Sequence, residues 1–320
     1  MHWVEQWHNG LDSFTLHTSG STGKPKSIEI SRAAIQASVQ ATLKALDLGP
    51  GTRALLCLPY DKIAGFMMVV RALVGRWELW VTEPQKVPLE KADHFDFAAM
   101  VPYQAYASWP RLPQVNKLLI GGGAITPNLA TKLKEYEGMV YHSYGMTETI
   151  THVALQQLAP QRQSFFQALP GVSFTADDRN CLVINAPKLQ VHELVTNDVV
   201  DLRDAHSFVW RGRADHAITV AGSTYLPEEI EQQISWTSSA IMVTAVPHST
   251  LGEQIALVLE QEHWPRPEEL YEALQAVPHR QKPKTIYLLP NFEYTPNGKL
   301  QRAKTQELLV KAQPKIWPYT

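Results

Sequence analysis

T-S-G-S-T-G-K-P-K, at residues 18–26, is the most informative stretch of the sequence, because it combines two glycines, four hydroxyls and two lysines. Glycine allows backbone N–H groups to approach a ligand, while hydroxyl and ammonium groups supply donors and positive charge. The stretch therefore predicts a polyphosphate-binding loop. It differs from the loop of kinases and GTPases, which has four residues between its glycines, whereas two residues separate Gly20 from Gly23 here. The alternative is a solvated turn rich in Gly, Ser and Lys.

The composition describes a globular enzyme of two domains. The chain has 320 residues, of which 44% are hydrophobic and 19% charged, and this suits a large domain plus a small one. A formal net charge of −2 gives no long-range attraction to nucleic acid or to anionic membranes. The sequence contains neither a bilayer-spanning segment nor a signal pattern, so we expect a cytoplasmic protein. The two cysteines and twelve histidines show no metal-type spacing.

Short apolar segments alternate with helical ones downstream of the loop. Strands are expected at 53–58, 77–81, 95–101, 116–120 and 139–143, and helices at 31–46, 65–73 and after Thr126. This alternation predicts an α/β fold with a parallel-type sheet wrapped by helices and with ligand sites at the carboxyl ends of the strands. Ser31 is expected to cap a helix directly behind the loop, so that the positive end of the helix faces the anion.

The pattern changes near residue 165. Short alternating strands at about 165–212 predict a small β subdomain, which completes a large domain at residues 1–212. Residues 213–320 are expected to form a smaller, mobile α+β domain. Hairpin-like segments are expected at S-F-V-W, just before this boundary, and at A-I-T-V-A after it. The second unit would also contain strands at 241–246 and 254–260, and helices after Pro227 and Gly298.

The hexapeptide Y-G-M-T-E-T, at residues 144–149, follows an expected strand. Together with residues 18–26 it resembles the adenylate-forming superfamily of acyl-CoA synthetases, peptide adenylation domains and luciferases. The resemblance implies that the protein uses ATP and Mg²⁺ to convert a carboxylate to an acyl-adenylate and then transfers the acyl group to a thiol such as coenzyme A. It also implies that Tyr144 stacks on adenine, that Thr147 bonds the α-phosphate and that Glu148 holds Mg²⁺. The implied nucleotide-binding residues of the two glycine-rich regions and the phosphate loop are Thr18, Ser19, Gly20, Ser21, Thr22, Gly23, Lys24, Lys26, Gly121, Gly122, Gly123, Ala124 and Gly145.

Three C-terminal motifs extend the resemblance. In L-V-T-N-D-V-V-D-L, Asp198 would accept both ribose hydroxyls, and W-R-G-R-A-D-H would supply Arg213 to the ribose and Asp215 as the hinge between the domains. In Y-T-P-N-G-K-L-Q-R, the family's catalytic lysine corresponds to Lys299, which stabilises charge during adenylation. Gly222 matches the glycine that lines the pantetheine tunnel after a domain rotation.

The segment L-P-Y-D-K-I-A-G-F-M-M-V-V-R, at residues 58–71, resembles the o-succinylbenzoate-CoA ligases of menaquinone biosynthesis. That resemblance implies that Arg71 pairs with a free carboxylate of the acid, a role suited to a planar guanidinium. The alternative is an arginine on the outer face of an amphipathic helix. Lys62, Ala64 and His152 differ from the residues usual in that family and would alter the acid pocket.

The sequence begins 17 residues before the phosphate loop, where the superfamily has well over a hundred. We therefore expect a reduced large domain with exposed apolar surface, covered in a homodimer. The leading hypothesis is a ligase for o-succinylbenzoate, ATP and coenzyme A. The alternatives are a ligase for another acid, an enzyme that loads a carrier protein, and a non-catalytic nucleotide-binding protein.

Overall fold

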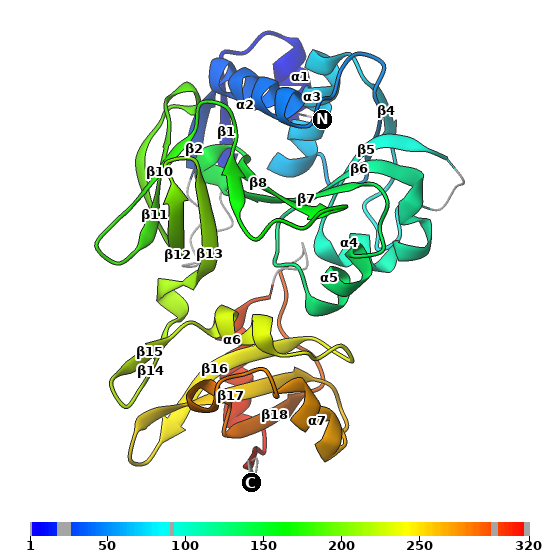
Figure 1. The fold of residues 1–320 in the computed structure, drawn as a ribbon. Helices are drawn as coiled ribbons and strands as arrows, with labels where there is room; N and C mark the ends of the chain where they lie inside the picture. Colours follow the sequence, from blue (N-terminus) through cyan, green and yellow to red (C-terminus); the bar gives the residue numbers. More distant parts are fainter. Residues whose placement is uncertain (1, 18–26, 90–92, 296–299, 317–320) are drawn as a thin grey trace.

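The computed structural model describes residues 2–17, 27–89, 93–295 and 300–316. These residues form an eleven-stranded sheet in the upper part of Figure 1 and a four-stranded sheet in the lower part. The chain leaves the large sheet at Arg213, passes through the 3-10 turn η4 (Ala214–His216) and enters the lower unit.

The large sheet is mixed, in the order β10-β11-β12-β13-β9-β8-β7-β6-β5-β3-β4. The parallel half contains β3 (Arg53–Leu56), β4 (Glu78–Val81), β5 (Phe95–Met100), β6 (Val115–Ile120) and β7 (Met139–Gly145). The antiparallel half contains β8 (His152–Ala159), β9 (Phe166–Ala168), β10 (Ser173–Ala176), β11 (Cys181–Ala186), β12 (Val191–Asp204) and β13 (Ser207–Arg213).

The parallel half was predicted correctly from the sequence, whereas the expected β subdomain is not a separate sheet. Its strands continue the large sheet, because the short strand β9 pairs with both β8 and β13. Both expected hairpin-like segments lie in antiparallel hairpins, but S-F-V-W pairs with β12 in the large sheet and not within the second unit. S-F-V-W belongs to β13 of the large sheet, and the following hairpin consists of β14 (Ile218–Val220) and β15 (Ser223–Tyr225).

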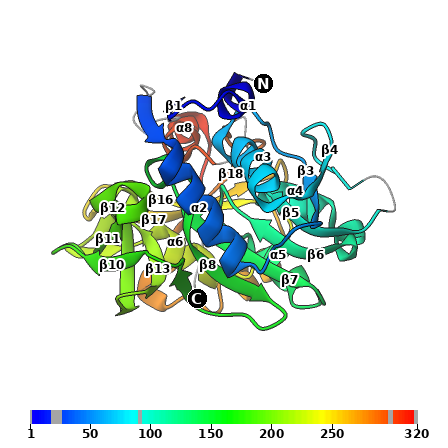
Figure 2. The same cartoon turned by 90° about the horizontal axis from the view of Figure 1, so that it is seen from above.

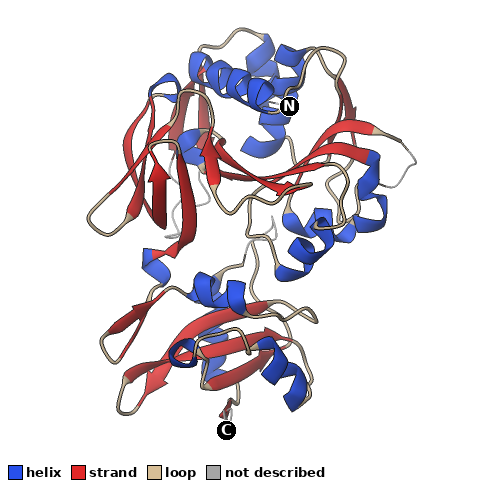
Figure 3. Cartoon of the chain, in the orientation of Figure 1, coloured by secondary structure: helices blue, strands red, loops and turns tan. Residues whose placement is uncertain are grey.

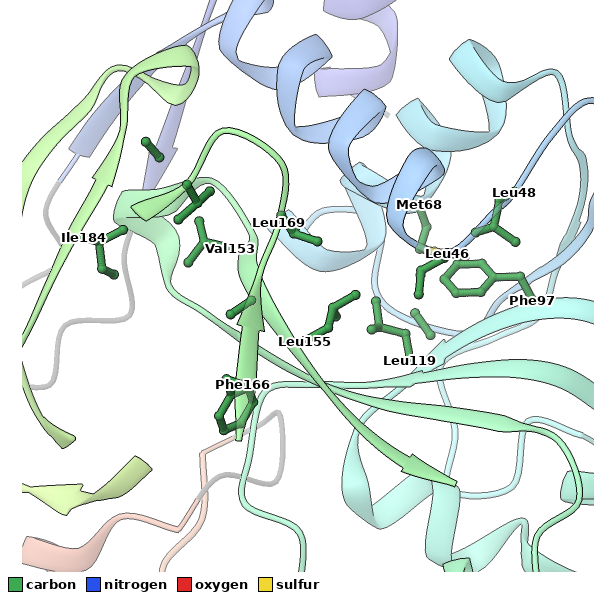
Figure 4. Close-up of a cluster of buried hydrophobic side chains, with 14 of the residues drawn as sticks. Leu46, Leu48, Met68, Phe97, Leu119, Val153, Leu155, Phe166, Leu169 and Ile184 are labelled. Atoms are coloured by element: carbon green, nitrogen blue, oxygen red, sulfur yellow. The ribbon is translucent and has the colours of Figure 1, made fainter. Parts of the chain in front are cut away.

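Helices cover both faces of the large sheet. α1 (His2–His8), α2 (Arg32–Ala45) and α3 (Ile63–Gly75) lie above it in Figure 1, and α4 (Pro102–Ala107) and α5 (Pro127–Leu133) lie below it. Seen from above, α2 runs across the middle, with β10 to β13 on one side and β3 to β7 on the other (Figure 2). Leu46 after α2, Met68 of α3 and Phe97 of β5 meet in the core between these layers (Figure 4).

Helix α3 determines where the acid-binding candidate lies. The sequence I-A-G-F-M-M-V-V-R-A-L-V-G is apolar on nearly all sides, and such a helix is buried rather than laid on the surface. Phe66, Met67, Met68 and Val70 are fully buried. Because Arg71 lies within this run, the helix carries its side chain into the interior as well.

The expected phosphate loop at residues 18–26 lies outside the described residues, whereas the segments on either side of it are described. Ser31 caps α2 by accepting a hydrogen bond from the Ala34 amide at 3.1 Å, as predicted. However, β2 (Ser27–Ser31) lies between residues 18–26 and the helix, and it pairs antiparallel with β1 (Ser13–His17). A five-residue strand spans about 16 Å, and the positive end of α2 lies at the base of the β1–β2 hairpin, where Ser13 pairs with Ser31.

The lower unit combines a small sheet with several helices (Figure 3). Its strands are β16 (Ile241–His248), β17 (Gly252–Glu260), β18 (Thr285–Leu289) and β19 (Lys315–Ile316), and its helices are α6 (Pro227–Gln233), α7 (Pro267–Ala273) and α8 (Arg302–Leu308). Within the described residues, no helix combines the length and the apolar character that crossing a membrane requires.

Candidate active site

The two glycine-containing turns expected to hold the nucleotide lie at neighbouring carboxyl ends, because β6 and β7 are adjacent parallel strands. Gly121, Gly122, Gly123 and Ala124 follow β6, and Gly122 has φ of +80°, a left-handed conformation that glycine adopts without steric cost. The Oγ of Ser143 occupies the space beside Gly121, where an added Cβ would lie 2.4 Å from it. A side chain at position 121 would therefore collide with Ser143.

Gly145 at the end of β7 is fixed by close packing of backbone on backbone. A Cβ at this position would lie 2.2 Å from the carbonyl oxygen of Thr151 and 2.5 Å from Cα of His152. The register between β7 and β8 shifts at this point. Only glycine allows the Y-G turn and the start of β8 to approach this closely.

Asp198 is the centre of a hydrogen-bonded cluster built from three strands. Tyr144 of β7 donates its hydroxyl to Oδ2 of Asp198 at 2.7 Å, and Trp210 of β13 donates Nε1–H to Oδ1 at 3.0 Å. Arg213 Nη1 lies 3.8 Å from Oδ1. The structure thus brings Tyr144, Asp198 and Arg213 together, although 69 residues of sequence separate the first from the last.

The Tyr144 ring is held on its other side by aromatic packing. Its centroid lies 5.1 Å from Phe208 and 5.8 Å from Phe166. Burial, followed by the charge and hydrogen bond of Asp198, raises the pKa of Tyr144 above its usual range. The phenol therefore remains a proton donor at all working pH values.

Thr147 and Glu148 lie in the 3-10 turn η2 (Thr147–Thr149), directly after β7. Glu148 is exposed, and the described residues contain no group of three or more potential metal ligands. A single exposed carboxylate fits Mg²⁺, which usually binds one or two protein carboxylates and completes its shell with phosphate oxygens and water. Glu148 would hold the ion, and the bound Mg²⁺ would neutralise phosphate charge during the reaction.

A tight turn connects this segment to β8. The Thr151 amide donates to the Thr149 carbonyl at 2.7 Å, and Ile150 between them has φ of +66° and ψ of −57°. These values define a γ-turn, which is strained for a β-branched residue. The Thr149 hydroxyl donates within the same turn and lies near the carbonyl oxygens of both Met146 and Thr151, at 3.0 and 2.7 Å.

Arg71 is a buried arginine that lacks a carboxylate partner in the described part of the chain. Its side chain is 2% exposed, and its Nη2 donates to the Thr151 hydroxyl at 3.3 Å. Its Nε has no hydrogen-bond partner among the described residues. Burial lowers the pKa of Arg71 to about 10, so the guanidinium is charged at neutral pH. The alternative of an arginine on an outer helix face is wrong.

His152 lies beside Arg71, whereas Lys62 and Ala64 do not. His152 is 4% exposed, and its pKa is lowered well below the usual value by burial and by the charge of Arg71. Lys62 is exposed at the start of α3 and lies 3.6 Å from Asp61. Nine residues of helix separate Lys62 from Arg71, or about 13 Å. Ala64 lies in the same exposed first turn.

The segment after β13 joins the cluster to the lower unit. Arg213 donates to both carboxylate oxygens of Asp215, at 2.8 and 2.7 Å. Glu228 of α6 accepts a hydrogen bond from the Arg213 amide and is paired with His216 and Arg302. Burial opposes the ionisation of Glu228, but the hydrogen bond from His216 and the charge of Arg302 hold its pKa below the usual value.

Other candidates lie elsewhere or outside the described residues. Gly222 has φ of +80° and forms the β14–β15 turn in the lower unit, apart from the large sheet (Figure 1). Lys299 is outside the described residues, as are the loop residues Thr18, Ser19, Gly20, Ser21, Thr22, Gly23, Lys24 and Lys26.

Sequence reasoning missed three residues that contact the candidates. Trp210 holds Asp198, Thr151 holds Arg71, and His142 Nε2 lies 3.1 Å from the carbonyl oxygen of Gly123. Burial lowers the pKa of His142, so the ring is neutral. Trp210 could have been found from its register, because W-R-G-R places it three residues before Arg213 on a strand beside Asp198. Thr151 carried no signal.

Comparison with known proteins places this geometry in a family. The AMP-binding enzyme family matches residues 12–176. The crystal structure of an acyl-CoA synthetase (AMP-forming)/AMP-acid ligase II-like protein from Dyadobacter fermentans is 38% identical, covers 96% of this chain and 93% of its own, and superposes with a TM-score of 0.63.

More distant relatives share the fold. The o-succinylbenzoate coenzyme A synthetase of Bacillus subtilis, solved with ATP and magnesium, is 16% identical with a TM-score of 0.77 over 91% of this chain and 69% of its own. The D-alanine-D-alanyl carrier protein ligase of Bacillus mycoides is 22% identical over 91% of this chain and 69% of its own. The chain spans only 4% of the length of one large curated relative. The family match, the strongly similar acyl-CoA synthetase structure and the Tyr144–Asp198–Arg213 cluster together show that the chain belongs to the AMP-binding, adenylate-forming enzymes.

Proposed function

We propose that the protein is an ATP-dependent acid-thiol ligase that converts o-succinylbenzoate to its coenzyme A thioester through an acyl-adenylate. The family supplies the class of reaction. The choice of acid depends on the groups that surround Arg71.

The single observation that carries the choice of acid is the buried, uncompensated charge of Arg71. No carboxylate contributes to its pKa, and its Nε is unpaired among the described residues. Burying an ion without a partner costs several kcal/mol, and an arginine-carboxylate pair with two hydrogen bonds recovers much of that cost. Because adenylation consumes one carboxylate, the substrate needs a second one for Arg71. A dicarboxylic acid such as o-succinylbenzoate meets this requirement.

The nucleotide would be held by the cluster around Asp198. Asp198 presents a carboxylate to the ribose hydroxyls, and Trp210 and Arg213 fix its orientation. Tyr144 would stack on the adenine opposite the Gly121 to Ala124 turn, as the family resemblance implies. Thr147 would donate to the α-phosphate, and Lys299 would stabilise negative charge on the attacking carboxylate and the nucleotide as the acyl-phosphate bond forms.

We also propose that residues 1–212 and 213–320 move relative to each other about Asp215. The contacts of Glu228 with the Arg213 amide, and of Arg211 with Glu229 at 2.6 Å, connect the two parts in this structure. Arg211 and Arg213 lie directly before η4, whereas Glu228 and Glu229 lie in the first turn of α6. A rotation at η4 would bring Gly222 and its hairpin toward the site for the thiol step.

The test is mass-spectrometric detection of acyl-CoA formed from ATP, Mg²⁺, coenzyme A and a panel of acids. The panel pairs o-succinylbenzoate with its analogue that lacks the carboxylate not activated in the reaction. Product from the dicarboxylate alone is expected. Equal product from both acids would contradict the role of Arg71, and absence of product with ATP still bound would favour a non-catalytic nucleotide-binding protein.

A ligase for another acid, or one that loads a carrier protein, is the second candidate. It is favoured by the similarity to the D-alanyl carrier protein ligase and by Lys62 and Ala64, which differ from the residues usual in o-succinylbenzoate ligases. Transfer to a carrier protein but not to free coenzyme A would support it.

A further inference from the structure

A continuous series of polar contacts runs from Arg71 to helix α2. Arg71 Nη2 donates to the Thr151 hydroxyl at 3.3 Å, and this hydroxyl lies 3.3 Å from Nδ1 of His152. On the far side of the ring, Nε2 of His152 lies 3.2 Å from the Thr42 hydroxyl, which lies 3.0 Å from the carbonyl oxygen of Ser38. The groups come from α3, the start of β8 and α2.

The number of available protons determines which group donates and which accepts in each of these contacts. Burial and the charge of Arg71 keep His152 neutral at working pH, so the ring carries one proton. Arginine can only donate, so the Thr151 oxygen accepts from Arg71 and its own proton is free for Nδ1. The Thr42 proton goes to the Ser38 carbonyl, so its oxygen accepts from Nε2–H. With the proton on Nε2, each of the four contacts pairs one donor with one acceptor. With the proton on Nδ1, Thr151 would receive two donors and its own proton would have no acceptor in the series.

We propose that His152 is a positioning residue: as the neutral Nε2–H tautomer it fixes the Thr151 hydroxyl, and through it holds the Arg71 guanidinium with Nε free for the second carboxylate of the acid. This inference rests on the proposed function. It assigns His152 a different role from the substrate contact implied by the sequence, because both ring nitrogens are already used and the side chain is 4% exposed.

The arrangement explains why Arg71 can remain buried with few partners. A guanidinium has several rotatable bonds before it, and a single contact to a freely rotating hydroxyl would hold it weakly. The lone pair of Nδ1 fixes the Thr151 proton on the side away from Arg71, so that the Thr151 lone pairs face the guanidinium. Thr42, anchored on α2, fixes the ring in turn.

Thr42→Val tests the proposal, because valine has nearly the same shape and removes only the hydroxyl that accepts Nε2–H. Thr42→Ser is the matched control, since it retains the hydroxyl. We expect Thr42→Val to raise KM for o-succinylbenzoate about five- to tenfold, the effect of one lost buried hydrogen bond. KM for ATP should be unchanged, and Thr42→Ser should match the parent protein. A purely structural role would lower the melting temperature without separating the two KM values, and that result would overturn the proposal.

The tautomer itself can be measured without any substrate. In protein labelled with ¹⁵N-histidine, the His152 signals are those absent from a His152→Gln variant. Protonated Nε2 is expected in the parent protein and a loss of this preference in Thr42→Val. Protonated Nδ1 in the parent protein would overturn the inference whichever acid reacts. If the tautomer is as expected but none of the acids gives product, the proposed function fails and the arrangement of the side chains stands.

Discussion

Replacing Arg71 by methionine should stabilise the free protein and abolish its use of a dicarboxylic acid. The pKa of Arg71 falls from 12.5 to about 10 through burial alone. This difference corresponds to a cost of about 3 kcal/mol for burying the charge, which is fully present at neutral pH. The contact with Thr151 offsets about 1 kcal/mol of it. Methionine has a similar length and no charge, so Arg71→Met should gain about 2 kcal/mol.

The gain should be visible as a rise in melting temperature of about 4–8 °C, because 1 kcal/mol shifts a large domain by a few degrees. Its pH dependence has a definite sign. The folded-state pKa is lowered, so the parent protein bears the cost below pH 10 and loses it as the pH rises through 10 toward 12.5. The stability difference between variant and parent should therefore narrow above pH 10. Differential scanning calorimetry at pH 7 and pH 10.5 measures both effects.

Activity should change in the opposite direction. Arg71→Met should reduce kcat/KM for o-succinylbenzoate at least a hundredfold, because the second carboxylate would be buried without a partner. ATP binding should be preserved. Arg71→Lys keeps a cation, so its kcat/KM for o-succinylbenzoate should lie between those of Arg71→Met and the parent protein. If Arg71→Met melts below the parent protein and still makes the thioester at the parent rate, Arg71 is a structural arginine and the choice of acid has no basis.

Three further predictions concern the rest of the site. Asp198→Asn should raise KM for ATP about ten- to a hundredfold, because it removes the carboxylate that is expected to accept hydrogen bonds from the ribose hydroxyls. Steady-state kinetics at saturating acid checks this. Gly145→Ala should destabilise the fold by more than about 2 kcal/mol, because its Cβ would lie 2.2 Å from a backbone oxygen, whereas Gly49→Ala, with nothing within 4 Å, should not. The folded-state pKa of Glu228 is lowered, so its ionised form stabilises the fold above about pH 4.5, and this stabilisation is lost as the pH falls further. Glu228→Gln should therefore have a lower free energy of unfolding than the parent protein at pH 7, measured with urea, and the difference should be smaller at pH 3.5.

Local sequence signals predicted the parts of the fold that depend on local contacts. The cap at Ser31 and the first turn after Thr126 form as expected, because both side chains accept amide hydrogen bonds from residues three positions later. The parallel strands were also visible, since each is a short apolar run. The continuity of the large sheet was not, because it depends on the three-residue strand β9, which is too short to leave a periodic pattern.

In the candidate site, too, the residues in sequence motifs could be predicted, whereas the contacts that depend on tertiary packing could not. Asp198 and Arg213 were identified from motifs, and pairing between β12 and β13 brings them together. The burial of Arg71 follows from the apolar sequence of α3, but its partner Thr151 could not be predicted. That contact depends on how α3 packs against the start of β8, which is a tertiary arrangement without a sequence period. His152 was identified because it differs from the residue usual at this position in the family. Its proposed role depends on the contact with Thr42, which is 110 residues away in the sequence.

The γ-turn at Ile150 connects the nucleotide and acid halves of the site and explains why changes in one half should leave the other intact. Thr147 and Glu148 lie just before the turn, and Thr151 and His152 just after it. A β-branched residue at φ of +66° costs about 1–3 kcal/mol, but the Ile150 side chain is 1% exposed, and its burial returns about 2–3 kcal/mol. The hydroxyl of Thr149 lies near carbonyls on both sides of the turn. Each half is thus anchored to a rigid turn and not to the other half, so a lost contact at Thr42 weakens the hold on the acid without displacing Glu148.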